Sequence, residues 1–500
     1  MIMNHENNDN NKIILHDITD REHILEKEIS RGGQGAVFRT NDNNIAVKLV
    51  LENDDFLTLP KYSKQEIDRQ NKQFRRLILL PIPSRTNITL PLVTFTDAVG
   101  YTMKLMEDMD SFENVFEKEG KKYTNPWFQQ TFQEDDPMGR SFAGYVGSGG
   151  ARKRLHAFYL CSCILARLHA NGLVYCDFSD KNVFLTKKTY ENNVEFNDYR
   201  ERDDYIFTDY ENDNVWLIDA DNLNYQSVTI KSGYYTPNYG APEVVASQGC
   251  TFYSDCYAFA VSLFWNLTLN HPFKGEAYEN CGFDDFDEDA DELLNNGKFS
   301  FVCDEQDDSN ISGSPFIDML LNDKIMNTFR RTFSERGKTE IRTRPSIMEW
   351  SQVIADSLDT TITCTECRMP FCESKFGSEC PWCEHENTLV IIESYVSENM
   401  ETGTHTGSFR REIRQEIPVN IPLRIMTGIR HSSPDEVAFR ISVKNGIMTF
   451  SSFNPDYSFS VISTEKIIAG KYETNKESVD IHCRNIQREE HYYLRIGITK

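Results

Sequence analysis

The sequence predicts an α+β protein in three parts, and three observations support this division. Residues 20–358 mix helix-like and strand-like periodicity and contain most of the motifs described below. Residues 360–388 gather five of the thirteen cysteines. Residues 389–500 alternate apolar and polar positions, as half-buried strands do. A chain of 500 residues is too long for one hydrophobic core, so we expect separate units after a polar extension over 1–19.

Composition excludes several classes of protein. The formal net charge of −24 repels nucleic-acid phosphates, so nucleic acid is not an expected partner. The polar N-terminus lacks the basic and apolar regions of a secretory signal. The most apolar stretch, 259–269, is too short to span a bilayer. We therefore expect a cytoplasmic protein with no membrane partner.

A glycine-rich turn and a strand that ends in lysine mark the N-terminal region. In segment 30–38, SRGGQGAVF, the absence of a Cβ lets backbone N–H groups approach phosphates closely. A plain hairpin would also accept these glycines. The run 45–48, IAVK, then places Lys48 after three apolar residues, where an ammonium can reach bound phosphates. Residues 62–79 have helical spacing.

Two further segments each present a polar group after an apolar run. In VYCDFSDKN, 174–182, which follows a predicted helix over 151–170, Asp177 could orient a nucleophile and Asn182 offers an amide oxygen to Mg²⁺. In VWLIDAD, 215–221, the apolar run ends at Asp219. Either segment alone is compatible with an ordinary turn.

The order of these motifs resembles that of the protein kinases. Gly32, Gly35 and Val37 occupy places in the pattern G-x-G-x-x-G-x-V, with a serine for the first glycine. The run IAVK resembles V-A-I-K, and the later segments resemble H-R-D-x-x-x-x-N and D-F-G. Farther on, GAPE at 240–243 resembles A-P-E, SDCYAF at 254–259 resembles the start of the central helix, and Arg344 resembles the arginine that pairs with the A-P-E glutamate.

The resemblance implies a two-lobed protein-kinase-like fold, with an N-lobe over about 20–108 and a C-lobe over about 109–358. It implies ATP and Mg²⁺ as cofactors, a protein Ser/Thr hydroxyl as acceptor, and an aspartate in the segment 254–259 that ties down the catalytic loop. Asp177 would be the catalytic base, Asn182 and Asp219 would hold Mg²⁺, and Lys48 would contact phosphates and pair with Glu66. The residues implied to contact ATP are Gly32, Gly33, Gly35, Val37, Ala46, Lys48, Asn182 and Asp219.

Some positions depart from the family pattern. Tyr175 and Cys176 replace the usual His-Arg, which makes control by activation-loop phosphorylation less expected. Ala220 and Asp221 replace the Phe and Gly of D-F-G. The chain looks like a divergent bacterial-type Ser/Thr kinase with C-terminal accessory domains. An active enzyme is favoured over the alternative, a pseudokinase scaffold that binds ATP and recruits partners. A small-molecule kinase is disfavoured by the A-P-E motif.

The cysteine-rich segment has the spacing of a metal site. Cys364 and Cys367 form one C-x-x-C, and Cys380 and Cys383 form a second. Four thiolates at this spacing can share one tetrahedral Zn²⁺, and the arrangement resembles a zinc ribbon over 360–388. Whether Cys372 or His385 joins the site stays open. The excess of glutamates around it argues against nucleic-acid binding.

The last part predicts a small antiparallel β-sandwich over 389–500. Apolar residues stand at the odd positions 413, 417, 419, 421, 423 and 425, with Pro418 and Pro422 on the opposite parity, which predicts an edge strand. Residues 437–443 alternate before Asn445-Gly446, a hairpin signal, and 492–498 form a closing strand. This part could dock a partner. The Gly/Ser-rich stretch 144–150 predicts a flexible loop.

Overall fold

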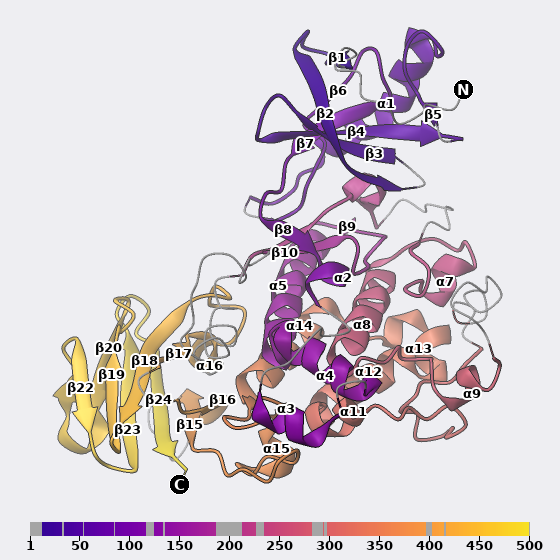
Figure 1. Cartoon of the computed structure of the whole chain (residues 1–500). Helices are drawn as coiled ribbons and strands as arrows, with labels where there is room; N and C mark the ends of the chain where they lie inside the picture. The colour runs from indigo at the N-terminus through magenta and orange to yellow at the C-terminus, as the bar shows by residue number, and fades with distance from the viewer. Residues whose placement is uncertain are drawn as a thin grey trace.

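The computed structural model describes residues 13–32, 35–53, 55–84, 86–116, 125–133, 136–186, 213–226, 235–282, 294, 298–396, 403–414 and 417–499. Figure 1 shows a sheet-rich N-terminal unit, a helical body, and a C-terminal β-unit beside that body. Among the described residues, no helix combines the length and apolar character that crossing a bilayer requires.

The N-terminal unit is a seven-stranded antiparallel sheet with one long helix. The strand order is β1-β2-β3-β4-β7-β6, with β5 paired to β4. Its elements are β1 Ile14–His16, β2 Glu22–Gly32, β3 Gly35–Thr40, β4 Ile45–Glu52, β5 Asp55–Phe56, α1 Lys64–Ile78, β6 Val93–Thr94 and β7 Gly100–Lys104.

Helix α1 lies within the predicted range 62–79 and begins with a capping box. The Ser63 side chain accepts from the Glu66 amide, and the Glu66 carboxylate accepts in turn from the Ser63 amide at 3.2 Å. This reciprocal pair satisfies backbone donors that the first turn leaves open. The inward face of α1 consists of Ile67, Asn71, Phe74 and Leu77.

The helical body contains most of the helices. Its elements are β8 Met109–Ser111, α2 Phe112–Val115, α3 Pro126–Thr131, α4 Pro137–Gly147, α5 Gly150–Ala170, β9 Leu173–Val174, β10 Val183–Thr186, β11 Val215–Leu217, η2 Ala220–Asn222, β12 Asn224–Tyr225, α7 Pro242–Val245, α8 Phe252–Thr268, α9 Glu276–Glu279, α11 Pro315–Leu320, α12 Asp323–Phe333, α13 Glu335–Thr339, η3 Ile341–Thr343 and α14 Ile347–Thr360.

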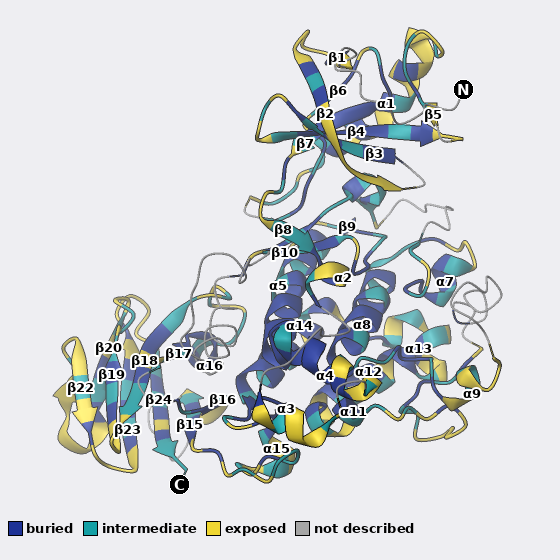
Figure 2. Ribbon diagram, viewed as in Figure 1, coloured by how far each residue is buried: buried dark blue, intermediate teal, exposed yellow. Residues whose placement is uncertain are grey.

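Helices α5 and α8 form the buried centre of this body, as Figure 2 shows. Trp350 of α14 packs against Phe259 of α8 and Phe329 of α12, with ring centroids 6.2 and 5.0 Å apart. Burying one such aromatic side chain contributes about 1.5–3 kcal/mol. The predicted flexible loop at 144–150 is wrong, because α4 ends at Gly147, α5 begins at Gly150, and the segment is buried except at Gly147.

The cysteine-rich segment follows α14 directly and shares the core of the helical body. It contains β13 Thr361–Thr363, β14 Pro370–Cys372 and α15 Glu373–Phe376. Cys364, Cys367 and Cys380 belong to the same apolar cluster as α5 and α8. The Trp382 ring packs 5.4 Å from that of Phe142 in α4. The segment is therefore built into the body rather than tethered to it.

The C-terminal β-unit consists of two antiparallel sheets around a common core. The six-stranded sheet has the order β16-β15-β24-β23-β20-β21, and the four-stranded sheet has the order β17-β18-β19-β22. Its elements are β15 Leu389–Val396, β16 Thr404–Glu412, β17 Val419–Pro422, α16 Arg424–Thr427, β18 Val437–Lys444, β19 Ile447–Ser451, β20 Tyr457–Val461, η4 Ile462–Thr464, β21 Lys466–Ile467, β22 Lys471–Thr474, β23 Ser478–Asn485 and β24 His491–Ile498.

The strand predictions in this unit have different outcomes. The Asn445-Gly446 turn joins β18 to β19, with positive φ at both residues, and is confirmed. Strand β17 lies at the edge of its sheet, as the prolines predict. The single strand over 413–425 is wrong, because the chain turns into α16 at Arg424. Residues 415–416 lie outside the described residues.

Two buried ion pairs join the β-unit to the helical body. Arg152 of α5 donates to both carboxylate oxygens of Glu412 in β16, at 3.0 and 2.6 Å. Arg424 of α16 does the same to Asp359 of α14, at 3.1 and 2.5 Å. Bidentate pairs of this kind fix orientation as well as distance. The β-unit is therefore held in one orientation against α5 and α14.

We expect Glu412→Gln to lower the free energy of unfolding by about 3–5 kcal/mol, because it leaves the Arg152 guanidinium buried without its counter-charge. The measurement is urea unfolding at neutral pH. Arg484→Met, at the exposed Arg484–Glu489 pair, is the matched control and should cost at most about 1 kcal/mol.

The same pair predicts a pH dependence. Burial would raise the pKa of Glu412, but the Arg152, Arg414 and Arg411 guanidiniums outweigh it and the pKa lies below its usual value. A lowered folded-state pKa means that the stabilisation is complete above the unfolded pKa of about 4.3 and is lost as the pH falls through the folded value. Glu412→Gln should therefore flatten the acid limb of the stability curve; an unchanged limb would contradict this assignment.

Candidate functional site

A buried lysine joins the N-terminal sheet to the helical body. Lys48 lies in the middle of β4 and is 7% exposed. Its Nζ donates to Asp219 Oδ1 at 2.5 Å and to Asp221 Oδ2 at 2.7 Å. Burial lowers the pKa of Lys48, but the two carboxylates outweigh it, so the pKa lies above its usual value. The ammonium is therefore charged and fixed in place.

Glu66 does not pair with Lys48, which corrects the expectation from sequence. The Glu66 side chain is exposed and bonded to Ser63 at the start of α1. The remaining acid of α1, Asp68, is also exposed and pairs with Arg75 at 2.6 Å. The helix therefore brings no carboxylate to Lys48.

The backbone after β11 explains how two aspartates reach one lysine. Asp219 has φ 53° and ψ 57°, in the left-handed region, and the 3₁₀ turn η2 follows at once. This tight turn brings Asp221 back to the same side as Asp219. Tyr101 of β7 then donates its hydroxyl to Asp221 Oδ1 at 2.6 Å.

Asp177 lies in a pocket of hydrogen-bond donors. Its Oδ1 accepts from the amide and hydroxyl of Thr236 at 3.1 and 2.8 Å, and its Oδ2 accepts from Asn182 Nδ2 at 3.1 Å. Burial raises the pKa of Asp177, and the hydrogen bonds from Thr236 and Asn182 oppose that rise. Thr236 shows that a hydroxyl can reach this carboxylate.

The loop that carries Asp177 is held by hydrogen bonds to helix α8 and to the chain after β11. Asp255 of α8 accepts from the amides of Tyr175 and Cys176, both at 2.8 Å. This contact confirms the expected tie between the central helix and this loop. The Tyr175 hydroxyl donates to the Ile218 carbonyl, and the Ile218 amide donates to the Asn182 carbonyl at 2.9 Å. These contacts hold Asp177, Asn182 and Asp219 in one region.

The glycine-rich turn lies between β2 and β3. Gly32 pairs with Gly35 in the antiparallel register, whereas Gly33 lies outside the described residues. A Cβ on Gly35 would lie 2.5 Å from the Leu49 carbonyl oxygen of β4, so the close strand approach requires glycine. Val37 and Ala46 lie on the neighbouring strands β3 and β4. Their contact with a nucleotide stays a prediction.

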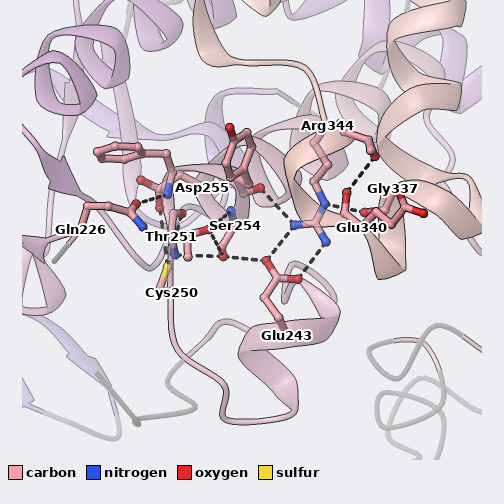
Figure 3. A network of polar contacts seen from close by, with 12 residues as sticks. Gln226, Glu243, Cys250, Thr251, Ser254, Asp255, Gly337, Glu340 and Arg344 are labelled. Carbon is pink, nitrogen blue, oxygen red and sulfur yellow. Dashed lines mark hydrogen bonds and ion pairs between the residues drawn. The ribbon is translucent and has the colours of Figure 1, made fainter. Parts of the chain in front are cut away.

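Figure 3 shows the expected pair between Glu243 and Arg344, which is confirmed. Arg344 donates to the two Glu243 oxygens at 2.7 and 2.8 Å, and the Ser254 hydroxyl donates to the same carboxylate at 2.7 Å. Burial raises the pKa of Glu243, but Arg344 outweighs it and the pKa is lowered. The network ties α7 to α8 and to the chain before α14.

We expect Arg344→Met to lower the free energy of unfolding by about 3–5 kcal/mol, because it leaves the buried Glu243 carboxylate without its counter-charge. Chemical denaturation measures the loss. Arg336→Met, at the exposed Arg336–Glu340 pair, should cost about 0.3–0.5 kcal/mol. Equal losses for the two variants would show that the buried pair contributes no more to stability than the exposed one.

The four cysteines of the two C-x-x-C motifs form one cluster. Cys364, Cys367, Cys380 and Cys383 place their sulfur atoms within 4.8 Å of one another. Two of the separations are 3.7 Å, for Cys364–Cys383, and 3.6 Å, for Cys367–Cys380. Four sulfurs at the corners of a tetrahedron, each about 2.3 Å from a metal, are about 3.8 Å apart. The group could therefore hold a metal such as zinc.

The neighbouring candidates lie outside this cluster. Cys372 is buried and its sulfur contacts the Ser374 hydroxyl at 3.2 Å. His385 Nε2 contacts the Thr365 hydroxyl at 3.0 Å. Among the described residues, the donor set is thus the four thiols alone.

Sequence reasoning missed three contacts of this site. The I-D-A-D segment shows a second acid two positions after Asp219, but its reach to Lys48 depends on the left-handed turn. Tyr101 and Thr236 follow from no motif; their roles depend on strand register and on the path of a distant loop. The spacing S-x-x-E at 63–66 is a capping-box signal that would have identified Glu66 as a helix cap.

No protein-family model matches the chain. A stretch of 121 residues, 24% of the chain, is 31% identical to Protein kinase C-like 1 of Candida albicans. The match spans 9% of that protein's length. The similarity is thus confined to a small part of each protein.

Proposed function

We propose that the protein is an ATP-dependent protein kinase that transfers the γ-phosphate of ATP to a protein Ser/Thr hydroxyl, and that it acts in the cytoplasm. The observation that carries this proposal is the contact of Lys48, from the N-terminal sheet, with Asp219, from the helical body. A fixed cation and a carboxylate thus meet between the N-terminal sheet and the helical body, which supports a two-lobed kinase-like arrangement. Phosphoryl transfer depends mainly on positioning and charge neutralisation of this kind.

Each residue has a distinct part in the proposed reaction. Lys48 binds phosphate oxygens through its ammonium. The glycine turn at Gly32 and Gly35 lets backbone N–H groups approach the phosphates. Asp177 orients the acceptor hydroxyl and takes its proton. The hydroxyl of Thr236, 2.8 Å from Asp177 Oδ1, supports an alcohol in that position.

The polar groups fit the metals that the reaction and the fold imply. Asn182 and Asp219 offer the oxygen ligands that Mg²⁺ prefers, and both lie beside Asp177. Bound there, Mg²⁺ would neutralise charge on the phosphates. The four-thiol group suits Zn²⁺, which would stabilise the segment after α14 without taking part in the reaction.

A second candidate function is a scaffold that binds ATP without transferring phosphate. The observation that favours it is the second carboxylate at Lys48, because Asp221 adds negative charge where the phosphates would bind. The β-unit, held rigidly on α5 and α14, would then present a docking surface for a protein partner.

The experiment that separates these functions measures ATP binding and phosphate transfer in the same preparation. Purified protein is incubated with Mg²⁺ and γ-labelled ATP, with and without a generic protein substrate, beside Lys48→Met. A kinase gives acid-stable label on serine or threonine, and Lys48→Met lowers its rate of appearance strongly. Binding of ATP without any transfer in the parent protein would support the scaffold.

A further inference from the structure

The acid that holds Lys48 comes from the segment after β11, not from helix α1. Lys48 has two carboxylate partners, Asp219 and Asp221, and both lie after β11. Both acids of α1 face solvent and are used locally, Glu66 with Ser63 and Asp68 with Arg75. The helix therefore has no carboxylate left to supply.

We propose that Asp221 is the residue that positions Lys48 for phosphate binding. The inference takes the role of Lys48 in phosphate binding from the proposed function. The contact between Lys48 and Asp221 is observed independently of that function. Asp219 is a proposed metal ligand, so with Mg²⁺ bound its carboxylate would serve the metal as well as the lysine. Asp221 is the carboxylate partner of Lys48 that is not a proposed metal ligand.

The surroundings of Asp221 suit a fixed partner. Its side chain is 15% exposed, against 35% for Asp219. One oxygen accepts from Lys48 and the other from the Tyr101 hydroxyl. Tyr101 lies directly opposite Lys48 in the β4–β7 register, and its ring packs 4.8 Å from Phe74 of α1. The Tyr101 hydroxyl thus holds the Asp221 carboxylate within hydrogen-bonding distance of Lys48.

This arrangement places the acid that pairs with Lys48 in the 3₁₀ turn η2 rather than in helix α1. Helix α1 supports Asp221 only indirectly, because Phe74 holds the Tyr101 ring and Asn71 bonds the backbone of the same strand at Gly100. A shift of α1 would therefore act on Lys48 through Tyr101 and Asp221. The local contacts make Asp221 a positioning residue that acts through Lys48.

The first test reads the lysine directly and needs no catalysis. The full-length protein is treated briefly with acetic anhydride, and acetylation of Lys48 is measured by peptide mass spectrometry. We expect Asp221→Asn to raise the Lys48 acetylation rate about tenfold, as loss of one ion pair at a buried amine implies. Tyr101→Phe should give a smaller rise in the same direction. Asp68→Asn is the matched control and should leave the rate unchanged.

Glu66→Gln decides between the two assignments. No change with Glu66→Gln supports Asp221, whereas a rise with Glu66→Gln and none with Asp221→Asn would overturn the proposal. The melting temperature of each variant is measured alongside. If Asp221→Asn fails to fold, Tyr101→Phe replaces it, because this variant keeps the packed aromatic ring. An unchanged Lys48 acetylation rate in Tyr101→Phe would then count against the proposal.

The second test separates positioning from structure. At saturating Mg·ATP we expect Asp221→Asn to lower the turnover for phosphate transfer about tenfold through misplacement of the lysine. In a Lys48→Met background the same change should have no further effect on residual transfer. Additive losses would overturn the proposal. If the parent transfers no phosphate, the proposed function fails, yet the acetylation test still decides the role of Asp221.

Discussion

Asp177→Asn is expected to lower the rate of phosphate transfer from Mg·ATP about 10²–10⁴-fold, the range for loss of a general base. The amide is nearly the same shape as the carboxylate and can still accept from Thr236. It can no longer take a proton from the acceptor hydroxyl. ATP binding should change little, because in the proposed site the phosphates are bound by Lys48 and the glycine turn rather than by Asp177.

Single-turnover transfer and equilibrium binding of ATP measure these two quantities separately. Asp308→Asn, at an exposed position, is the matched control and should retain full transfer. A variant at Asp177 that transfers phosphate at the parent rate would remove this residue from the proposed reaction. A variant that loses ATP binding instead would show that its role is structural.

Cys364→Ser is expected to have the largest effect on stability. It removes one of four thiols from a cluster that lies in the main core of the helical body. Metal binding to Cys₄-type sites contributes about 10–16 kcal/mol in isolated zinc-finger peptides. We therefore expect loss of bound metal, a large fall in melting temperature and poor recovery of folded protein.

The metal content is measured by elemental analysis, with one zinc per chain expected for the parent protein. Cys372→Ser changes a buried cysteine in the same segment that lies outside the cluster. It should retain the metal and melt close to the parent temperature. A metal-free parent that melts at the same temperature as Cys364→Ser would contradict the assignment.

Local signals account for the elements that were predicted correctly. The apolar spacing of 62–79 and 151–170 predicted α1 and α5, and the Asn445-Gly446 pair predicted a hairpin with positive φ at both residues. The two C-x-x-C motifs predicted the thiol cluster. In each case the physical cause lies within a few residues of the pattern.

Context overrides the pattern where predictions failed. The alternation over 413–425 continues to Ile425, yet the chain turns into α16 so that Arg424 can reach Asp359 of α14. The glycines near 144–150 are typical of a loop, but small residues also let the chain turn tightly between α4 and α5 inside the core. Both outcomes depend on contacts with distant segments.

In the candidate site, too, some residues follow from local motifs and others depend on distant contacts. Lys48, Asp177, Asn182 and Asp219 were named from motifs, and their roles remain proposals. Glu66 was assigned by the usual order of the family pattern, although its capping box was visible in the sequence. The Lys48–Asp221–Tyr101 contact needs both the β4–β7 register and the turn after Asp219. No single segment of sequence contains that information.

The most direct test of the account follows the γ-phosphate in one turnover. Protein in excess over γ-labelled ATP and Mg²⁺ is quenched at intervals, and label is separated into ATP, free phosphate and protein. The account predicts label that moves from ATP to serine or threonine in the parent and stays in ATP with Asp177→Asn or Asp219→Asn. Label that remains in bound ATP in the parent as well would contradict the proposed kinase.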